Sequence, residues 1–166
     1  MPAVIAKFHD RFPEVNVTIV ECPVHLDAEQ ILREGRADIG FTLLPTTDEF
    51  EAWEILRDEY VLLIPPNTKF SDPPTWTDIA TLPLIVPPAD QPCEIDLYRH
   101  FARFAAPLNI VHKINQDSTI VSMVMQNLGV GILPRLAAEP IPEVIQTRSL
   151  PHRTRNSDLF ARNSDF

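Results

Sequence analysis

The stretch "NLGVGILP", residues Asn127–Pro134, decides the fold that we expect for this chain. It follows a helical pattern, passes through glycine and ends in an apolar run. A second stretch, "EGRADIGF" at Glu34–Phe41, repeats this passage, and the two stretches hold all four glycines of the 166 residues. Each passage is typical of a helix that ends and leads into a buried strand. Two equivalent passages predict two similar lobes.

The glycines of each stretch have two separate roles in this interpretation. Gly35 and Gly129 are expected to end their helices in the left-handed conformation, which glycine adopts without steric cost. Gly40 and Gly131 then let the following strand lie close to a neighbour. The rest of the chain has no glycine, so these are the places where the backbone is expected to need it.

Outward from these stretches, helical and strand patterns alternate. A helix begins at Pro2 and is ended by Pro13, and a second helix over "HLDAEQILREG" has Asp27 as its expected cap. The segment "EAWEILRDEYVLLIPP" predicts two strands around a turn at Arg57–Glu59. This alternation predicts an α/β fold. Further strands are expected at 15–22, 37–45, 82–88, 108–115, 130–134, 143–151 and 157–163, and further helices at 76–80, 94–105 and 117–129.

The composition is that of a globular, acidic chain. Hydrophobic residues make up 45% of it, enough for a core, and the formal net charge is −9. No cluster of Lys and Arg is present to neutralise phosphates, so this chain alone is not expected to bind DNA. No apolar stretch is long enough to span a membrane, and no secretory signal is recognisable, which indicates a cytoplasmic location. Cys22 and Cys93 lack a CxxC pattern and are interpreted as buried thiols.

Four motifs resemble, in their order and spacing, one known family. They are "F-x-x-x-F-P-x-V-x-V" at Phe8–Val17, "G-x-x-D-I-G-F-x-x-x-P" at Gly35–Pro45, "W-E-I-L-x-D-E-Y-V-L-L-I-P-P" at Trp53–Pro66 and "M-V-x-x-x-L-G-V-G-I-L-P" at Met123–Pro134. Over essentially its whole length, the chain is similar to the effector-binding domain of LysR-type transcriptional regulators. The resemblance implies an α/β, two-lobe type 2 periplasmic-binding-protein-like fold with largely parallel mixed sheets.

The resemblance also implies a division of the chain. Lobe one comprises residues 1–64 plus 153–166 and lobe two residues 65–152, with crossover strands near Leu63–Pro66 and Leu150–Arg155. The family's winged helix-turn-helix is absent from this chain, which we expect to be truncated at both ends, so DNA is bound only through a domain outside it. Members pair these domains side by side, which implies a homodimer or tetramer.

A small metabolite bound between the lobes is the implied effector. The family contacts it after the "G-x-x-D-I-G-F" strand, here at Thr42 and Leu43, and from the loop Pro87–Cys93. This loop contributes Pro87, Pro88, Ala89, Asp90, Gln91 and Cys93, and its prolines predict a rigid lip. Ser118 and Thr119 begin a helix whose free N–H groups suit a carboxylate or another small anion. Alternatively, Thr42 is an ordinary strand threonine, and Ser118 or Asp117 only caps its own helix, which for Ser118 is the favoured interpretation.

Other functions have less support in the sequence. The five histidines have no metal-site spacing, and P-loop, G-x-S-x-G and G-x-G-x-x-G motifs are absent, so no enzyme, cofactor or metal is expected. The acidic residues between Glu49 and Glu59 are interpreted as a solvated face. A stand-alone or periplasmic solute-binding protein of the same fold is the alternative. A pure oligomerisation module is another, with Tyr98, Phe101 and Phe104 as its contact face unless they fill the lobe's own core.

Overall fold

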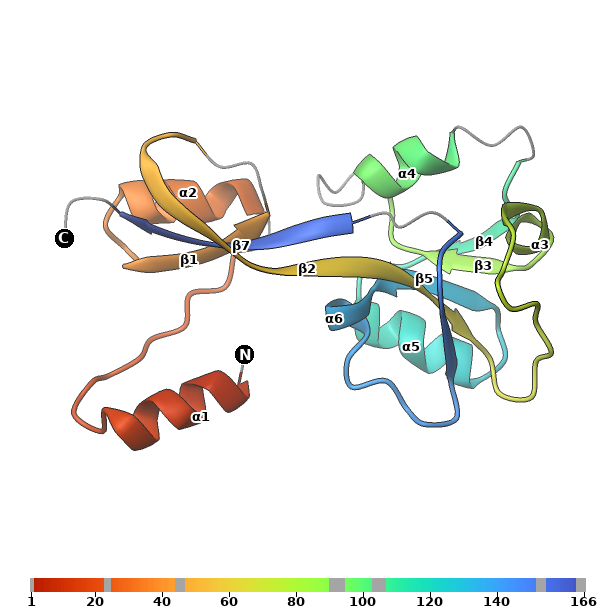
Figure 1. Cartoon of the computed structure of the whole chain (residues 1–166), viewed down its shortest axis with the longest axis horizontal. Coiled ribbons are helices and arrows are strands. Elements are labelled where there is room, and N and C mark those ends of the chain that lie inside the picture. The colour runs from red at the N-terminus through yellow and green to blue at the C-terminus, as the bar shows by residue number, and fades with distance from the viewer. Residues whose placement is uncertain are drawn as a thin grey trace.

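Two α/β lobes make up the protein in the computed structural model, which describes residues 2–22, 25–43, 47–89, 95–102, 107–151 and 155–163. Figure 1 shows the lobes side by side, joined by two long strands. These strands are β2 (Phe50–Ile64) and β7 (Arg155–Asn163), which run antiparallel to each other. The two-lobe α/β expectation is confirmed.

Lobe one is built on a small antiparallel sheet in the order β1-β7-β2, with β1 at Ile39–Leu43. Helix α2 (His25–Arg33) covers one face of it, where Leu32 and Phe50 are buried together. Because α2 begins at His25, the expected cap Asp27 lies inside the helix, and that prediction is wrong. On the opposite face, Phe41 and Trp53 are about half exposed and both pair in register with residue 160.

The N-terminal helix α1 (Pro2–Arg11) forms as the sequence predicts. Figure 1 shows it standing apart from lobe one at the end of an extended segment. The strand predicted at 15–22 is wrong, because this segment has no regular secondary structure and its Val17 and Ile19 are exposed. β-branched residues favour a strand only where a neighbouring strand and a packed face support them, and the described residues give this segment neither.

Lobe two is a mixed sheet in the order β2-β5-β3-β4, with β6 on the other edge of β2. The parallel pairs are β3 with β4 and β3 with β5, whereas β5 and β6 both run antiparallel to β2. Its strands are β3 (Leu84–Val86), β4 (Ile110–Lys113), β5 (Val130–Pro134) and β6 (Gln146–Ser149), and its helices are α3 (Trp76–Ala80), α4 (Ile95–Phe101), α5 (Asp117–Met125) and α6 (Arg135–Ala138).

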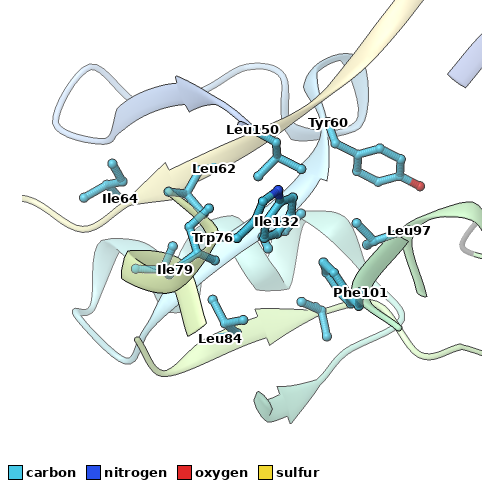
Figure 2. Packing of buried hydrophobic residues seen from close by; sticks show 12 residues of the cluster. Tyr60, Leu62, Ile64, Trp76, Ile79, Leu84, Leu97, Phe101, Ile132 and Leu150 are labelled. Carbon is cyan, nitrogen blue, oxygen red and sulfur yellow. The ribbon is translucent and has the colours of Figure 1, made fainter. Parts of the chain in front are cut away.

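Each face of this sheet has its own hydrophobic core. Alternate residues of β2 point to opposite faces, so Leu62 belongs to the core beneath α3 and α4, and Leu63 belongs to the core beneath α5 and α6. Figure 2 shows the first of these cores, where Trp76 of α3 and Phe101 of α4 meet. Their ring centroids are 6.1 Å apart in an edge-on arrangement, a favourable geometry for two aromatic rings.

Strand β2 is continuous through both lobes, so the turn predicted at Arg57–Glu59 is wrong. Its residues 50–59 pair with β7, and from Tyr60 onward it pairs with β5 and then also with β6. The change of partner falls at Glu59–Tyr60, a few residues before the expected crossover at Leu63–Pro66. A single irregularity in the pairing with β7 lies between Glu54 and Leu56.

Asp58 fixes β2 to lobe two where the strand changes partners. Its side chain is only 5% exposed. One carboxylate oxygen accepts a hydrogen bond from the Leu136 N–H at 3.0 Å, and the other accepts one from the Glu59 N–H at 2.9 Å. Asp58 therefore does not belong to a solvated acidic face, although Glu49, Glu51 and Glu54 are exposed as expected.

The ends of α2 and α5 share one backbone motif but not one residue type. After α2, the N–H of Arg36 donates to Ile31 and that of Gly35 to Leu32, and Gly35 has a φ of +64°. This confirms the role predicted for Gly35.

After α5 the same pair of bonds forms, but the left-handed residue is Asn127, with φ 58°. The helix-ending role of Gly129 is therefore wrong. Gly129 is required for a different reason, because a Cβ there would lie 2.5 Å from the Pro83 carbonyl oxygen. The Val130 N–H donates to that same oxygen at 2.8 Å, so the strand approaches too closely for any side chain.

Gly131 is confirmed as a close-packing position on β5. A Cβ there would lie 3.1 Å from methyl groups of both Ile120 and Val124. We expect Gly131→Val to lower the free energy of unfolding by about 1–3 kcal/mol, because the added methyls overfill this contact. Thermal and urea unfolding measure the loss. The control is Val144→Ile, which adds a methyl at a side chain that is 55% exposed. An unchanged melting temperature for Gly131→Val would contradict this packing.

Asp58→Ala should destabilise the protein by about 1–3 kcal/mol, because the Leu136 N–H then loses its acceptor, the buried Asp58 carboxylate. Asp58→Asn keeps one carbonyl oxygen and should lose less. Urea unfolding compares both with Glu51→Ala, a change at an exposed carboxylate of the same strand that should have almost no effect. Equal stability of Asp58→Ala and Glu51→Ala would show that this hydrogen bond is dispensable.

Candidate functional site

The carboxyl ends of three strands of lobe two face lobe one. Strand β2 enters lobe two at Tyr60, which pairs with Pro134, the last residue of the antiparallel β5. The end of β5 therefore lies on the side where lobe one is attached. Strand β3 runs parallel to β5, and β4 runs parallel to β3, so their ends, Val86 and Lys113, lie on the same side.

Lobe one presents the end of β1 in the opposite direction. Strands β1 and β2 are both antiparallel to β7, so they run the same way. Leu43, at the end of β1, pairs with Asp158 of β7. Leu56 of β2 pairs with the same residue, and from there β2 continues toward lobe two. Figure 1 shows β1 directed toward lobe two. Ligands of open α/β sheets bind beyond the carboxyl ends of strands, so these facing edges form the candidate site.

Thr42 lies at this edge, but its side chain is only 7% exposed. A Cβ at Gly40 would meet the Leu32 side chain of α2, and residue 42 shares that face of the strand because alternate strand residues point the same way. Thr42 thus points toward α2. The backbone of Leu43 is described and ends β1, while its side chain lies outside the described ones. Contact of either residue with a ligand stays a prediction.

The lip after β3 is described from Pro87 to Ala89, and Asp90, Gln91 and Cys93 lie outside the described residues. Pro87 is buried and Ala89 is exposed. The Pro87 carbonyl accepts a hydrogen bond from the Tyr98 hydroxyl at 2.8 Å. Tyr98 packs edge-on against Phe101, with ring centroids 5.6 Å apart. The first residue of the lip is therefore anchored to the core.

The same contacts weaken the oligomerisation alternative. Phe101 is 7% exposed and belongs to the core of lobe two, and Tyr98 packs against that core. These rings fill their own lobe, so they do not form a free contact face. Phe104 lies outside the described residues.

Ser118 and Thr119 lie at the start of α5, close after the end of β4. The residue in the capping position is Gln116, and no side chain caps the helix, so the capping role predicted for Asp117 or Ser118 is wrong. Ser118 is exposed, and its backbone carbonyl accepts from the Ser122 hydroxyl at 2.8 Å. Thr119 is half-buried, with its hydroxyl 3.4 Å from the Gln116 side-chain oxygen. Burial raises the pKa of the nearby Asp117 carboxyl above its ordinary value.

Two cations at this edge were missed by the sequence reasoning. Lys113 is the last residue of β4, and its ammonium nitrogen lies 5.8 Å from the centre of the Tyr98 ring. Arg135 directly follows β5, and its guanidinium lies 4.0 Å from a Glu59 carboxylate oxygen. Only position in the sequence points to them, because Lys113 lies near the end of the strand expected at 108–115 and Arg135 directly follows the strand expected at 130–134.

Two other kinds of site find no support in the described residues. Their His, Cys, Asp and Glu side chains form no group of three or more that is gathered as metal ligands would be. None of their helices has the length and apolar character needed to cross a membrane. Cys22 is a half-buried free thiol, and Cys93 lies outside the described residues.

Comparison with solved structures supports the type 2 periplasmic-binding-protein-like fold. The chain superimposes with a TM-score of 0.81 on the cofactor-binding domain of the Cbl transcriptional regulator, at 24% identity, over 98% of this chain and 73% of the other. It also matches the regulatory domain of CcmR from Synechocystis PCC6803, solved in complex with 2-PG. The TM-score is 0.79 at 11% identity, over 99% and 82% of the two chains. At these identities the likeness shows the fold alone.

Sequence comparison identifies the family. The chain is 43% identical over 152 residues to the probable HTH-type transcriptional regulator LrrA of Synechococcus elongatus. The aligned residues cover 91% of this chain and 51% of that protein. It thus spans about half the length of this relative. Residues 1–161 match the LysR substrate binding domain. The chain therefore belongs to the LysR substrate binding domain family.

Proposed function

We propose that this chain is the effector-sensing domain of a LysR-type transcriptional regulator and binds a small metabolite between its lobes. The observation that carries this proposal is the arrangement of strands, in which both lobes direct their carboxyl ends toward each other. The proposed contacts come from the end of β1, from the lip that begins at Pro87, and from Ser118 and Thr119. The complex of the CcmR regulatory domain with 2-PG supports a small organic ligand.

The two connecting strands provide a way to couple binding to movement. Lobes joined by a few strand residues can close around a ligand by small changes in backbone angles. Asp58 ties β2 to lobe two, so bending is expected on the lobe-one side of it, where the pairing with β7 is irregular between Glu54 and Leu56. Closure would then change the geometry of a homodimer or tetramer bound to DNA in the cytoplasm through another domain of the full protein.

The regulator is favoured over the solute-binding alternative by the relatives. LrrA is named as a transcriptional regulator, and a solute-binding protein would have no DNA-reading partner domain. An enzymatic role has no support in the comparisons, in which the named relatives are transcriptional regulators.

A ligand that binds only the folded protein raises its melting temperature, by an amount that grows with ligand concentration. We expect such a rise in a thermal-shift screen of small organic acids, amino acids and inorganic anions, including 2-PG. Titration calorimetry then gives the affinity of each hit. A screen with no hit, alongside a cooperative melt, would argue against a ligand-competent cleft in this chain.

Ser118→Trp should abolish binding of a hit without unfolding the chain, because the added ring occupies the edge from an exposed position. Thr42 is unsuitable for this test, since a bulky residue at a buried position would disturb lobe one. The matched control is Asn109→Trp, at an exposed residue just before β4 and hence at the opposite edge of the sheet. Wild-type affinity in Ser118→Trp would place the ligand elsewhere.

A further inference from the structure

Most arginines of the described lobes have a carboxylate partner. Arg33 pairs with Glu49, Arg57 with Glu54, Arg135 with Glu59 at 4.0 Å and Arg148 with Asp72 at 3.3 Å. Each of these pairs largely cancels its own charge. In a chain with a formal net charge of −9, such pairing leaves little positive potential with which to attract an anion.

Lys113 differs from these arginines. No carboxylate of the described residues lies within ion-pair distance of its ammonium group, which is held over the Tyr98 ring at 5.8 Å from the centroid. An aromatic ring attracts a cation through its electron-rich face but carries no net charge. The ring therefore orients Lys113 without neutralising it, and the side chain remains exposed.

The position of Lys113 places this charge at the candidate site. Lys113 ends β4 and is level with Val86, the last residue of β3. The next backbone N–H, that of Ile114, donates to the Val86 carbonyl at 3.0 Å. Lys113 thus lies beside the first residues of the lip and four residues before Asp117, where α5 begins.

Tyr98 connects the lysine to the lip. Its ring contacts the ammonium group, and its hydroxyl donates to the Pro87 carbonyl at 2.8 Å. Packing against Phe101, which is buried beside Trp76, fixes the ring itself. A single core-anchored side chain therefore sets the relative positions of a cation and of Pro87, the first residue of the lip.

We propose that Lys113 is the anion-recognising residue of the interlobe site and that Tyr98 is its positioning residue. The ligand class is a small organic anion, whose carboxylate or phosphate group meets the Lys113 ammonium while the rest of the molecule lies along residues 87–89, the described start of the lip. This inference rests on the proposed function and adds to it the charge of the ligand and the residue that recognises this charge. Arg135 lies at the same sheet edge, but Glu59 already engages it.

The test measures binding of charged and uncharged versions of the same compounds. The probes are malonate and malonamide, succinate and succinamide, 2-PG and inorganic phosphate, each assayed by thermal shift and calorimetry. Lys113→Met removes the charge but keeps the stem over the ring, Lys113→Arg keeps the charge, and Tyr98→Phe removes only the hydroxyl. Lys69→Met is the matched control, because Lys69 is exposed and follows the end of β2 that points away from lobe one.

We expect at least one of the anions to bind the wild-type chain and its uncharged counterpart, where there is one, to bind much more weakly. Lys113→Met should weaken binding of that anion roughly tenfold or more, as the loss of one charge-assisted contact does. Lys113→Arg and Lys69→Met should retain it, and added salt should weaken it in the wild type. Tyr98→Phe should weaken binding in calorimetry at a temperature where the variant is fully folded, an effect that a merely structural hydroxyl would not have.

Two other outcomes overturn the inference, and they are distinct from each other. If an amide binds as well as its acid, or Lys113→Met binds like the wild type, the cleft binds ligand but Lys113 does not read charge, and the proposed function stands. If no probe and no compound of the wider screen binds the wild-type chain, the proposed function fails and this inference fails with it.

Discussion

The constraint on which the rest of the structure depends is that a single strand, β2, belongs to two sheets. Its first part pairs with β7 in lobe one, and its last residues pair with β5 and β6 in lobe two. Because a strand has a fixed direction and two edges, this sharing orients every other strand. The ends of β1, β3, β4 and β5 are brought to face each other as a result, and Asp58 holds the strand where its partners change.

Much of this fold follows from local patterns, and the exceptions have tertiary causes. The charged run Arg57–Glu59 looks like a turn, but Asp58 is satisfied by a backbone N–H that lies 78 residues away in sequence. Asn127 and not Gly129 ends α5, and the need for glycine at 129 comes instead from its approach to the Pro83 carbonyl, in a distant segment of the chain. Strand formation at 15–22 depends on a pairing partner, which β propensity alone cannot supply.

The candidate site, like the fold, is predictable from the sequence only in part. The rule that ligands bind at strand ends predicts a site at the edge between the lobes. Pro87 and the start of α5 lie at that edge, and their contact with a ligand stays a prediction. Burial of Thr42 could not be predicted, because it depends on the packing of α2 across the strand. Lys113 cannot be identified from the sequence, because its importance comes from the Tyr98 ring, which lies on helix α4, and from the absence of a carboxylate near it among the described residues. Such features emerge only when distant segments are brought together.

The strand order of lobe one has a consequence for how the chain is made. The central strand of its sheet is β7, so β1 and the first part of β2 both pair with a segment close to the C-terminal end. A ribosome delivers β1, with its half-exposed Phe41, before the other described strands, and β7 after them. Besides the end of β2, the described strands of lobe two are β3 to β6, and these lie between β2 and β7 in the sequence. Lobe two can therefore assemble first. Until β7 is made, β1 and the first part of β2 lack their pairing partner. During that interval their unpaired strand edges are accessible to chaperones or to neighbouring chains.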